Sequence, residues 1–124
     1  MAETTQLELV TPIRIMALQA VEMVVAPGVE GLFGVLPRHA PLLADLTRGV
    51  VEVHENGKVT DRFMIDGGLA DVSGERVTIL AERAIHLGSA DAAQLKTQTA
   101  EVSDDEAAFL NAAIAALQIK IKDR

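Results

Sequence analysis

Apolar and polar residues alternate in short runs along the chain up to about residue 86. The apolar pairs with this spacing are Leu7 and Leu9, Val51 and Val53, Phe63 and Ile65, and Val77 and Ile79. A period of two is that of a β-strand with one face buried. The pattern therefore predicts strands from about residue 6 to about residue 86, and it predicts that His54, next to Val53, points to solvent.

Turn-forming residues separate these runs. They are Thr11-Pro12, Pro27-Gly28, Asn56-Gly57, Gly67-Gly68 and Ser73-Gly74. Asn56-Gly57 is the strongest hairpin signal, because both residues tolerate the positive φ of a type I′ turn. At Asp66-Gly67-Gly68 we predict a β-turn and not an anion-binding loop, because a strand pattern and no helix start follows. Many short strands at regular spacing predict an antiparallel β-sandwich or barrel.

The pattern becomes helical after His86, where Ala is frequent and Gly stops after Gly88. Ser89 is predicted to cap a first helix, which begins near Ala90 or Asp91 and runs to about residue 101. The short connection that follows, around residues 102–104, predicts an antiparallel pair of helices.

The second helix has a capping box, in which Ser103 is followed three residues later by Glu106. Asp104 and Asp105 suit the positive end of the helix dipole. The apolar stripe of this helix is Leu110, Ile114, Leu117 and Ile121, and the cations of its last turn are Lys120, Lys122 and Arg124. The predicted organisation is a β-sandwich domain over residues 1–86 and an α-helical hairpin over residues 87–124.

Composition narrows the function. The chain has 124 residues, no cysteine, 2% aromatic residues and a formal net charge of −7. Without cysteine there is no disulfide and no thiolate metal site. An acidic chain with few aromatic rings is not expected to bind nucleic acid, which needs a basic face. The N-terminus has no signal-peptide pattern and no apolar run is long enough to span a bilayer, so membrane association is expected only through a partner.

Catalytic motifs are absent from the sequence. The three histidines, His39, His54 and His86, are far apart, and no nucleotide-binding, metalloprotease or nucleophile-elbow signature is present. Spacing alone leaves open an enzyme that uses His39 with Asp45 or Asp66. More generally, the alternative to an interaction protein is a small β-sandwich ligand-binding or enzymatic domain with an unrelated helical tail.

The stretch GLFGV carries two readings. Leu32 and Phe33 lie between Gly31 and Gly34. They can belong to a buried strand, or they can form an exposed apolar tip at a protein–protein contact. Periodicity alone favours the buried strand, and both readings stay open at this point.

Three segments together resemble the ε subunit family of the F-type ATP synthase. They are PGVEGLFGVLPRHAPLLADLTRG from Pro27 to Gly49, MIDGGLADV from Met64 to Val72, and VTILAERA from Val77 to Ala84. The family's Gly-x-x-Pro-x-His-Ala-Pro-Leu-Leu motif stands here as Gly34, Pro37, His39, Ala40, Pro41, Leu42 and Leu43. Its later Gly-Gly pair stands as Gly67 and Gly68, with Asp71 where the family usually has glutamate.

The resemblance implies a non-catalytic subunit of the central rotor stalk, bound to γ and resting on the ring of c subunits, in a proton-translocating ATP synthase. It implies a peripheral location on the cytoplasmic face of the bacterial inner membrane. The family's contact with the ring and γ corresponds to Glu30, Gly31, Leu32, Phe33 and His39. In many bacterial members the C-terminal hairpin extends along γ and obstructs ATP hydrolysis.

The tail departs from the family pattern for ATP binding. Where ATP-binding members have Ile/Leu-Asp-x-x-Arg-Ala, this chain keeps Asp91 but has Gln94 in place of the arginine and Leu95 in place of the alanine. Glutamine lacks the charge that a guanidinium offers to phosphate, so no cofactor is predicted. The resemblance also implies a contact between an extended hairpin and the β subunit, through Lys120, Lys122 and Arg124.

Overall fold

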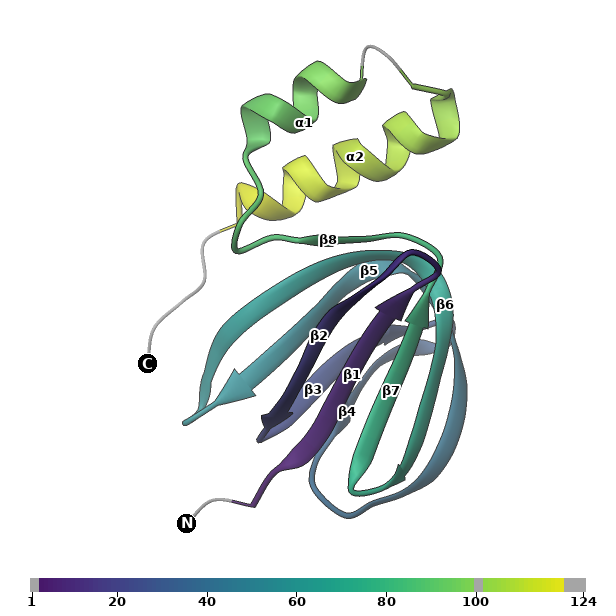
Figure 1. Ribbon diagram of the computed structural model, residues 1–124, viewed down its shortest axis with the longest axis vertical. Coiled ribbons are helices and arrows are strands. Elements are labelled where there is room, and N and C mark those ends of the chain that lie inside the picture. Colours follow the sequence, from purple (N-terminus) through teal and green to yellow (C-terminus); the bar gives the residue numbers. More distant parts are fainter. Residues whose placement is uncertain (1–2, 100–101, 120–124) are drawn as a thin grey trace.

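The computed structural model describes residues 3–99 and 102–119 and shows a layered β domain topped by two helices (Figure 1). The strands are β1 (Thr5–Thr11), β2 (Arg14–Val21), β3 (Met23–Gly28), β4 (Gly31–Val35), β5 (His39–Glu55), β6 (Lys58–Gly74), β7 (Arg76–Ala81) and β8 (Ala84–His86). The helices are α1 (Ala92–Thr99) and α2 (Asp104–Leu117).

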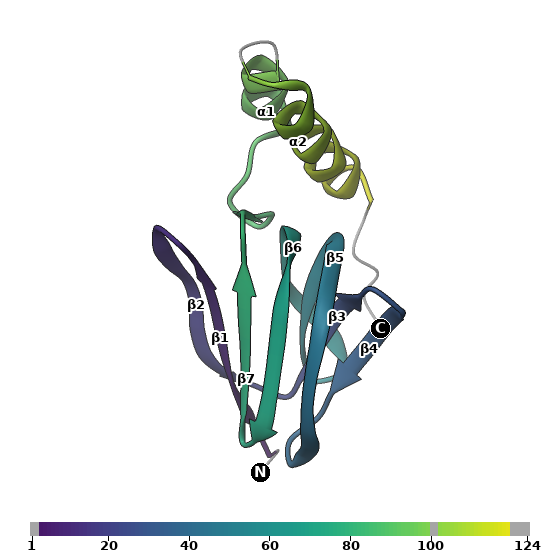
Figure 2. The same cartoon turned by 90° about the vertical axis from the view of Figure 1, so that its right-hand side faces the viewer.

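The strands form one folded sheet in the order β2-β1-β7-β6-β5-β3-β4, and β8 pairs with β6 off that path. The two central strands, β5 and β6, have 17 residues each. The C-terminal half of β6 pairs with β7, and its N-terminal half pairs with β8. The two long strands therefore pass through both layers of the sandwich, which face each other across the inner core (Figure 2).

The predicted β-sandwich followed by helices is confirmed, but three details differ. The sequence indicated many short strands, whereas β5 and β6 are long. One pair of strands, β1 with β7, is parallel. The predicted turn at Gly67-Gly68 is wrong, because both glycines lie inside β6. Both have positive φ, 73° and 141°. They allow β6 to bend at the point where its partner changes from β8 to β7, so the glycine pair marks a bend within a strand and not a turn between strands.

The predicted hairpin at Asn56-Gly57 is confirmed. Both residues have positive φ, 55° and 75°, and Glu55 pairs with Lys58 across the turn. These angles are those of the type I′ turn, which follows the natural twist of the flanking strands. The turn predicted at Pro27-Gly28 lies slightly later, because Gly28 is the last residue of β3.

Each predicted apolar strand pair is buried in the inner core. Leu7 and Leu9, Val51 and Val53, Phe63 and Ile65, and Val77 and Ile79 are all nearly inaccessible to solvent. His54 lies on the opposite face of β5 from Val53, where it is half-buried and its Nε2 lies 3.0 Å from Oε1 of Glu52. The period of two thus identified the inner face of these four strands, while His54 points away from the inner core but is only partly exposed.

A second core joins the helices to the outer face of the sandwich. Met64 lies between two inner-core residues of β6, and it packs with Val50 and Ile85 against the helical hairpin. The helical residues of this core are Leu95, Phe109, Leu110, Ala113, Ile114 and Ala116. Strands β5 and β6 are therefore apolar on both faces here, which explains the uninterrupted run FMI in the sequence.

The capping predictions had different outcomes. Ser103 is the N-cap of α2, and its Oγ accepts a hydrogen bond of 3.3 Å from the backbone N–H of Glu106, as predicted. The predicted Ser89 cap of α1 is wrong. Asp91 precedes that helix, and its Oδ1 accepts a 2.9 Å hydrogen bond from the N–H of Ala93. Ser89 instead belongs to a turn that returns to His86, with its N–H donating to the carbonyl of His86.

Helix α2 ends at Leu117 with Gln118 as its C-cap. The buried members of the predicted stripe are Leu110 and Ile114. Ile121 and the three predicted cations, Lys120, Lys122 and Arg124, lie outside the described residues.

Candidate functional site

The turn between β3 and β4 presents an apolar tip, formed by residues 29–33. Val29 and Glu30 make the turn, and Gly28 pairs with Gly31 below it. The side chain of Leu32 is 74% exposed, while Phe33 is half-buried and packs against the inner core. The stretch is a strand, as one of the two predictions held, but of Leu32 and Phe33 only Phe33 packs against the inner core. Leu32 fits the other prediction, an exposed apolar tip, because Leu32 and Phe33 point to opposite faces of β4.

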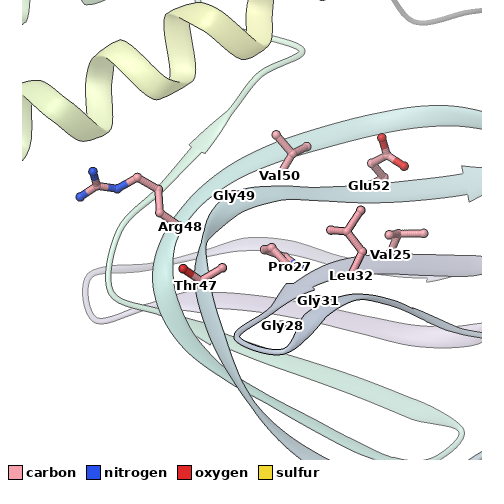
Figure 3. A pocket seen from close by; sticks show the side chains of 10 residues that line it. All are labelled: Val25, Pro27, Gly28, Gly31, Leu32, Thr47, Arg48, Gly49, Val50 and Glu52. Atoms are coloured by element: carbon pink, nitrogen blue, oxygen red, sulfur yellow. The ribbon is translucent and has the colours of Figure 1, made fainter.

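Two surface hollows lie beside this tip. One, of about 380 Å³, lies between β3, β4 and β5. Figure 3 shows Leu32 in it together with Val25, Pro27 and Val50, while the guanidinium of Arg48 points away. The other, of about 470 Å³, lies between residues 28–33 and residues 42–45. Exposed apolar side chains beside glycine-rich backbone favour contact with another protein, because water solvates such a surface poorly.

His39 occupies a rigid turn. Its N–H donates a 3.1 Å hydrogen bond to the carbonyl of Leu36. Pro37 fixes φ at the second position of this turn, and Arg38 has the positive φ of 64° that a type II turn needs at the third. The Nδ1 atom of His39 lies 2.6 Å from the carbonyl oxygen of Ala40. The imidazole is therefore held by the backbone of the next residue.

The structure does not bring His39 to the apolar tip. His39 pairs with Gly74 at one end of β5, whereas Leu46, seven residues further along β5, pairs with Gly28 beside the tip. At the rise of a β-strand this separates the two by roughly 20 Å. The predicted contact residues thus form two separate regions: residues 30–33 at the tip, and His39 at the far end of β4.

The enzymatic alternative finds no support in the contacts of His39. Neither Asp45 nor Asp66 is among its hydrogen-bond or ion-pair partners within residues 3–99 and 102–119. Over the same residues, no group of three or more His, Asp and Glu side chains is arranged to hold a metal ion. In that part of the chain no helix has the length and apolar character needed to cross a membrane.

A cluster of charges connects the hairpin to the sandwich; we call it the joint cluster. It consists of Arg48, Asp66, Arg83, Asp105 and the ring of Phe109. Asp66 accepts hydrogen bonds from both arginines, with 2.8 Å between Arg48 Nε and Asp66 Oδ1. Asp105, in the first turn of α2, lies 3.0 Å from Arg83 Nη2 and 3.5 Å from Arg48 Nη2. The guanidinium carbon of Arg83 lies 4.9 Å from the centroid of the Phe109 ring, and that of Arg48 lies 6.0 Å from it.

The electrostatics of the joint cluster favour the charged state of Asp66. Burial alone would raise its pKa, but the hydrogen bonds and charges of Arg48 and Arg83 outweigh burial and hold the pKa below its ordinary value. The hydrogen bond to Asp66 raises the pKa of Arg48. Desolvation opposes the charge of Arg83, yet Asp66 and Asp105 raise its pKa overall. The contacts within the cluster thus favour the charged forms of Asp66, Arg48 and Arg83.

A second polar link lies where the sandwich passes into the hairpin. His86 Nε2 lies 2.7 Å from Oδ1 of Asp61, and its Nδ1 lies 3.0 Å from the hydroxyl of Ser89. The imidazole also stacks on Phe63 at a centroid distance of 4.9 Å. At the other end of α2, Arg62 donates a 3.0 Å hydrogen bond to the carbonyl of Ala116. The hairpin is therefore attached to the sandwich at several points.

Asp91 and Gln94 both line a cleft of about 470 Å³ between the hairpin and the sandwich. The sequence singled out this pair as the departure from the nucleotide-binding pattern. In the structure, the carboxylate of Asp91 caps α1. Arg83 and His86 line the same cleft, and both are engaged by aspartates.

Sequence reasoning missed the joint cluster. Arg48 and Arg83 are single basic residues in strand patterns, and Asp105 was assigned only to the helix dipole. The only local signal was the position of Asp66 directly before two glycines, which was read as a turn. Residues 48 and 105 are 57 positions apart, so no periodic pattern could have related them.

The comparisons with known proteins agree with this architecture. The family described as ATP synthase, Delta/Epsilon chain, beta-sandwich domain matches residues 4–87. The ATP synthase epsilon chain of Rhodospirillum rubrum is 43% identical, over 94% of this chain and 96% of that one. The ATP synthase epsilon chain of Paramagnetospirillum magneticum is 42% identical, over 86% of this chain and 82% of its own length.

Two solved structures share the fold. A chain of the Euglena gracilis mitochondrial ATP synthase has a TM-score of 0.64 at 22% identity and matches 90% of this chain and 75% of its own. A chain from the central stalk and c-ring of the Tetrahymena thermophila mitochondrial ATP synthase has a TM-score of 0.62 at 14% identity. The match covers 92% of this chain and 96% of the Tetrahymena chain. Taken with the sequence matches, these findings show that the chain belongs to the ATP synthase delta/epsilon family and is similar to bacterial epsilon chains.

Proposed function

We propose that this chain is a non-catalytic subunit of the central stalk of a proton-translocating F-type ATP synthase, and that it couples rotation of the c-ring to the catalytic head through γ. The observation that carries the proposal is the 43% identity to an ATP synthase epsilon chain over nearly the whole length of both proteins. This match displaces the alternative of a ligand-binding or enzymatic sandwich with an unrelated tail.

The architecture suits a part that transmits torque. A sheet folded around two strands of 17 residues forms a stiff body, because both layers share the same strands. Packed protein interiors have low compressibility and transmit strain. Rotation is carried by shape and packing, so such a subunit needs durable contact surfaces and no reactive groups. Its place is peripheral, on the cytoplasmic face of the bacterial inner membrane, where the complex holds it.

The apolar tip is the proposed contact with the c-ring. Glu30 and Gly31 expose polar groups and backbone beside Leu32, which gives the rim and centre expected of a protein contact. His39, at the far end of β4, belongs to a second contact region facing γ. The separation of the two regions lets one face rest on the ring while another holds γ.

Replacing Leu32 with Ser is expected to weaken attachment of the subunit to ring-containing membranes by about tenfold or more, because an exposed apolar anchor is lost. The free energy of unfolding of the isolated chain is expected to change by less than about 0.5 kcal/mol, since Leu32 is outside the core. Cosedimentation with subunit-depleted membranes measures the first, and urea unfolding measures the second.

Phe33→Ser is the matched comparison, because it changes the neighbouring residue on the opposite face. It is expected to cost about 2–4 kcal/mol of stability, since the ring packs against the inner core. Unchanged membrane binding of Leu32→Ser would show that the tip is not the ring contact. Collapse of its stability would instead restore the buried-strand reading of Leu32.

We further propose that the hairpin of α1 and α2 regulates ATP hydrolysis by leaving the sandwich and extending along γ. In the extended position Lys120, Lys122 and Arg124 face acidic groups of the β subunit. The support is that the hairpin packs on the sandwich through a second core, which is separate from the inner core, and through a few polar links. A unit with its own small core can open while the rest of the protein stays folded.

Removing the residues after Gly88 tests this regulation. ATP hydrolysis by the assembled enzyme is expected to rise several-fold, because the segment that obstructs the catalytic head is gone. Hydrolysis is measured as phosphate release by membranes reconstituted with full-length or shortened subunit. Equal rates at equal subunit occupancy would contradict the regulatory role while leaving the stalk function intact.

A further inference from the structure

We propose that Arg48, Arg83 and Asp66 form a carboxylate-binding site on the sandwich, and that Asp105 is its exchangeable occupant, so that these ion pairs set the fraction of molecules with a docked hairpin. The proposal rests on the regulatory role above only for its biological consequence. The docking equilibrium itself is a property of the isolated chain.

The sandwich side of this site is complete without the hairpin. Arg48 belongs to β5, Asp66 to β6, and Arg83 to the connection between β7 and β8. Oδ1 of Asp66 accepts a hydrogen bond from Arg48, and Oδ2 accepts one from Arg83. The carboxylate thereby orients both guanidinium groups, and their remaining N–H groups project toward Asp105.

The charges make Asp105 the group that completes the site. Two arginines and one aspartate on the sandwich sum to +1, and Asp105 brings the cluster to zero. The side chain of Asp66 is 14% exposed, whereas that of Asp105 is 78% exposed. Asp66 is therefore fixed within the sandwich, and Asp105 is the member that exchanges with water.

The ring of Phe109 ties this ionic contact to the position of the helix. Phe109 lies one turn beyond Asp105 on the same face of α2, is buried, and lies beneath both guanidinium groups. Cation–π attraction and the ion pairs are therefore gained or lost together when α2 moves. On the sandwich side, the second core consists of the buried Met64 and Leu87 and the partly buried Val50 and Ile85. A modest ionic contribution can thus shift the docking equilibrium.

The test measures hairpin position in the full chain. Because the sequence contains no cysteine, cysteines placed at the exposed residues Glu75 and Asn111 give specific sites for two spin labels. Distances between the labels are recorded at ionic strengths from about 0.01 M to about 1 M, over which the Debye length falls from about 30 Å to about 3 Å. Asp105→Asn is compared with Asp104→Asn, its exposed neighbour in the same helical turn.

We expect a long-distance population that grows with salt in the parent protein and in Asp104→Asn. In Asp105→Asn the ratio of undocked to docked molecules is expected to be about two- to fivefold higher at low salt and to change little as salt is added. Asp105→Glu is expected to restore the salt dependence. Equal populations in the Asn variants, or a single short distance in every variant, would overturn the proposal. Neither outcome bears on binding to γ or the ring.

Discussion

Gly68→Ala is expected to lower the free energy of unfolding by about 4 kcal/mol, the largest effect among the single substitutions considered. Gly68 has a φ of 141°, and a Cβ built there would lie 2.1 Å from the backbone oxygen of Leu80. Backbone strain of this kind costs about 1–3 kcal/mol, and forcing β6 away from β7 adds an overpacking cost of similar size. Urea unfolding measures the loss.

Gly74→Ala is the control for Gly68→Ala. Gly74 also has a positive φ, of 54°, but no atom lies within 4 Å of a Cβ built there. Its substitution carries only the left-handed backbone cost of about 1–2 kcal/mol. If both variants lost the same free energy, the close approach between β6 and β7 would not be a constraint on the fold.

Asp66→Asn is expected to cost about 2–3 kcal/mol of stability at neutral pH. The carboxylate accepts hydrogen bonds from two arginines, and hydrogen bonds to charged groups are the more strongly stabilising ones. An amide offers one oxygen acceptor and cannot satisfy both guanidinium groups. Asp71→Asn, an exposed position on the same strand, is the control and is expected to change stability by less than about 0.5 kcal/mol.

The lowered pKa of Asp66 also makes the free energy of unfolding depend on pH, with stability lost in acid. The pKa of Asp66 is lowered in the folded protein relative to its ordinary value of 3.8. Its contribution is therefore fully present above that value and is lost as the pH falls through the folded pKa. We expect the stability difference between the parent protein and Asp66→Asn to be constant from neutral pH to about pH 5 and to shrink below pH 3.8. A difference that stays constant into strong acid would contradict the assigned ion pairs.

The sequence predicted the inner core well because a strand has a simple period. Leu7 and Leu9, or Val51 and Val53, face the same way in any strand, so alternation identifies the buried face without a structure. Capping is equally local, which is why the N-cap Ser103 was identified. The cap of α1 was misplaced by two residues because Ser89 and Asp91 both have cap chemistry, and the turn to His86 decided between them.

The bend in β6 and the exposure of Leu32 could not be read from local pattern. Two glycines suit a turn and a bend equally well, and only the pairing of β6 with both β7 and β8 distinguishes them. Alternation places Leu32 and Phe33 on opposite faces of β4, but it does not say which face has a layer packed against it. That information lies in the topology of the whole sheet.

The joint cluster depends on contacts distant in sequence, and sequence reasoning accordingly missed it. Arg48, Asp66, Arg83 and Asp105 come from four separate elements or connections, and each alone looks like an ordinary solvated charge. The resemblance to a family supplied the proposed partners, whereas the structure supplied the residues that hold the hairpin. The contact regions at Leu32 and His39 stay predictions until binding is measured.

Binding to γ tests the central claim most directly. The purified chain is mixed with the γ subunit from the same organism, and the mixture is separated by size-exclusion chromatography. A stalk subunit is expected to elute with γ as a complex of one copy of each, and to remain with ring-containing membranes when γ is present. If the chain elutes alone, while the Rhodospirillum rubrum epsilon chain forms a complex with its own γ under the same conditions, the proposed stalk function is contradicted.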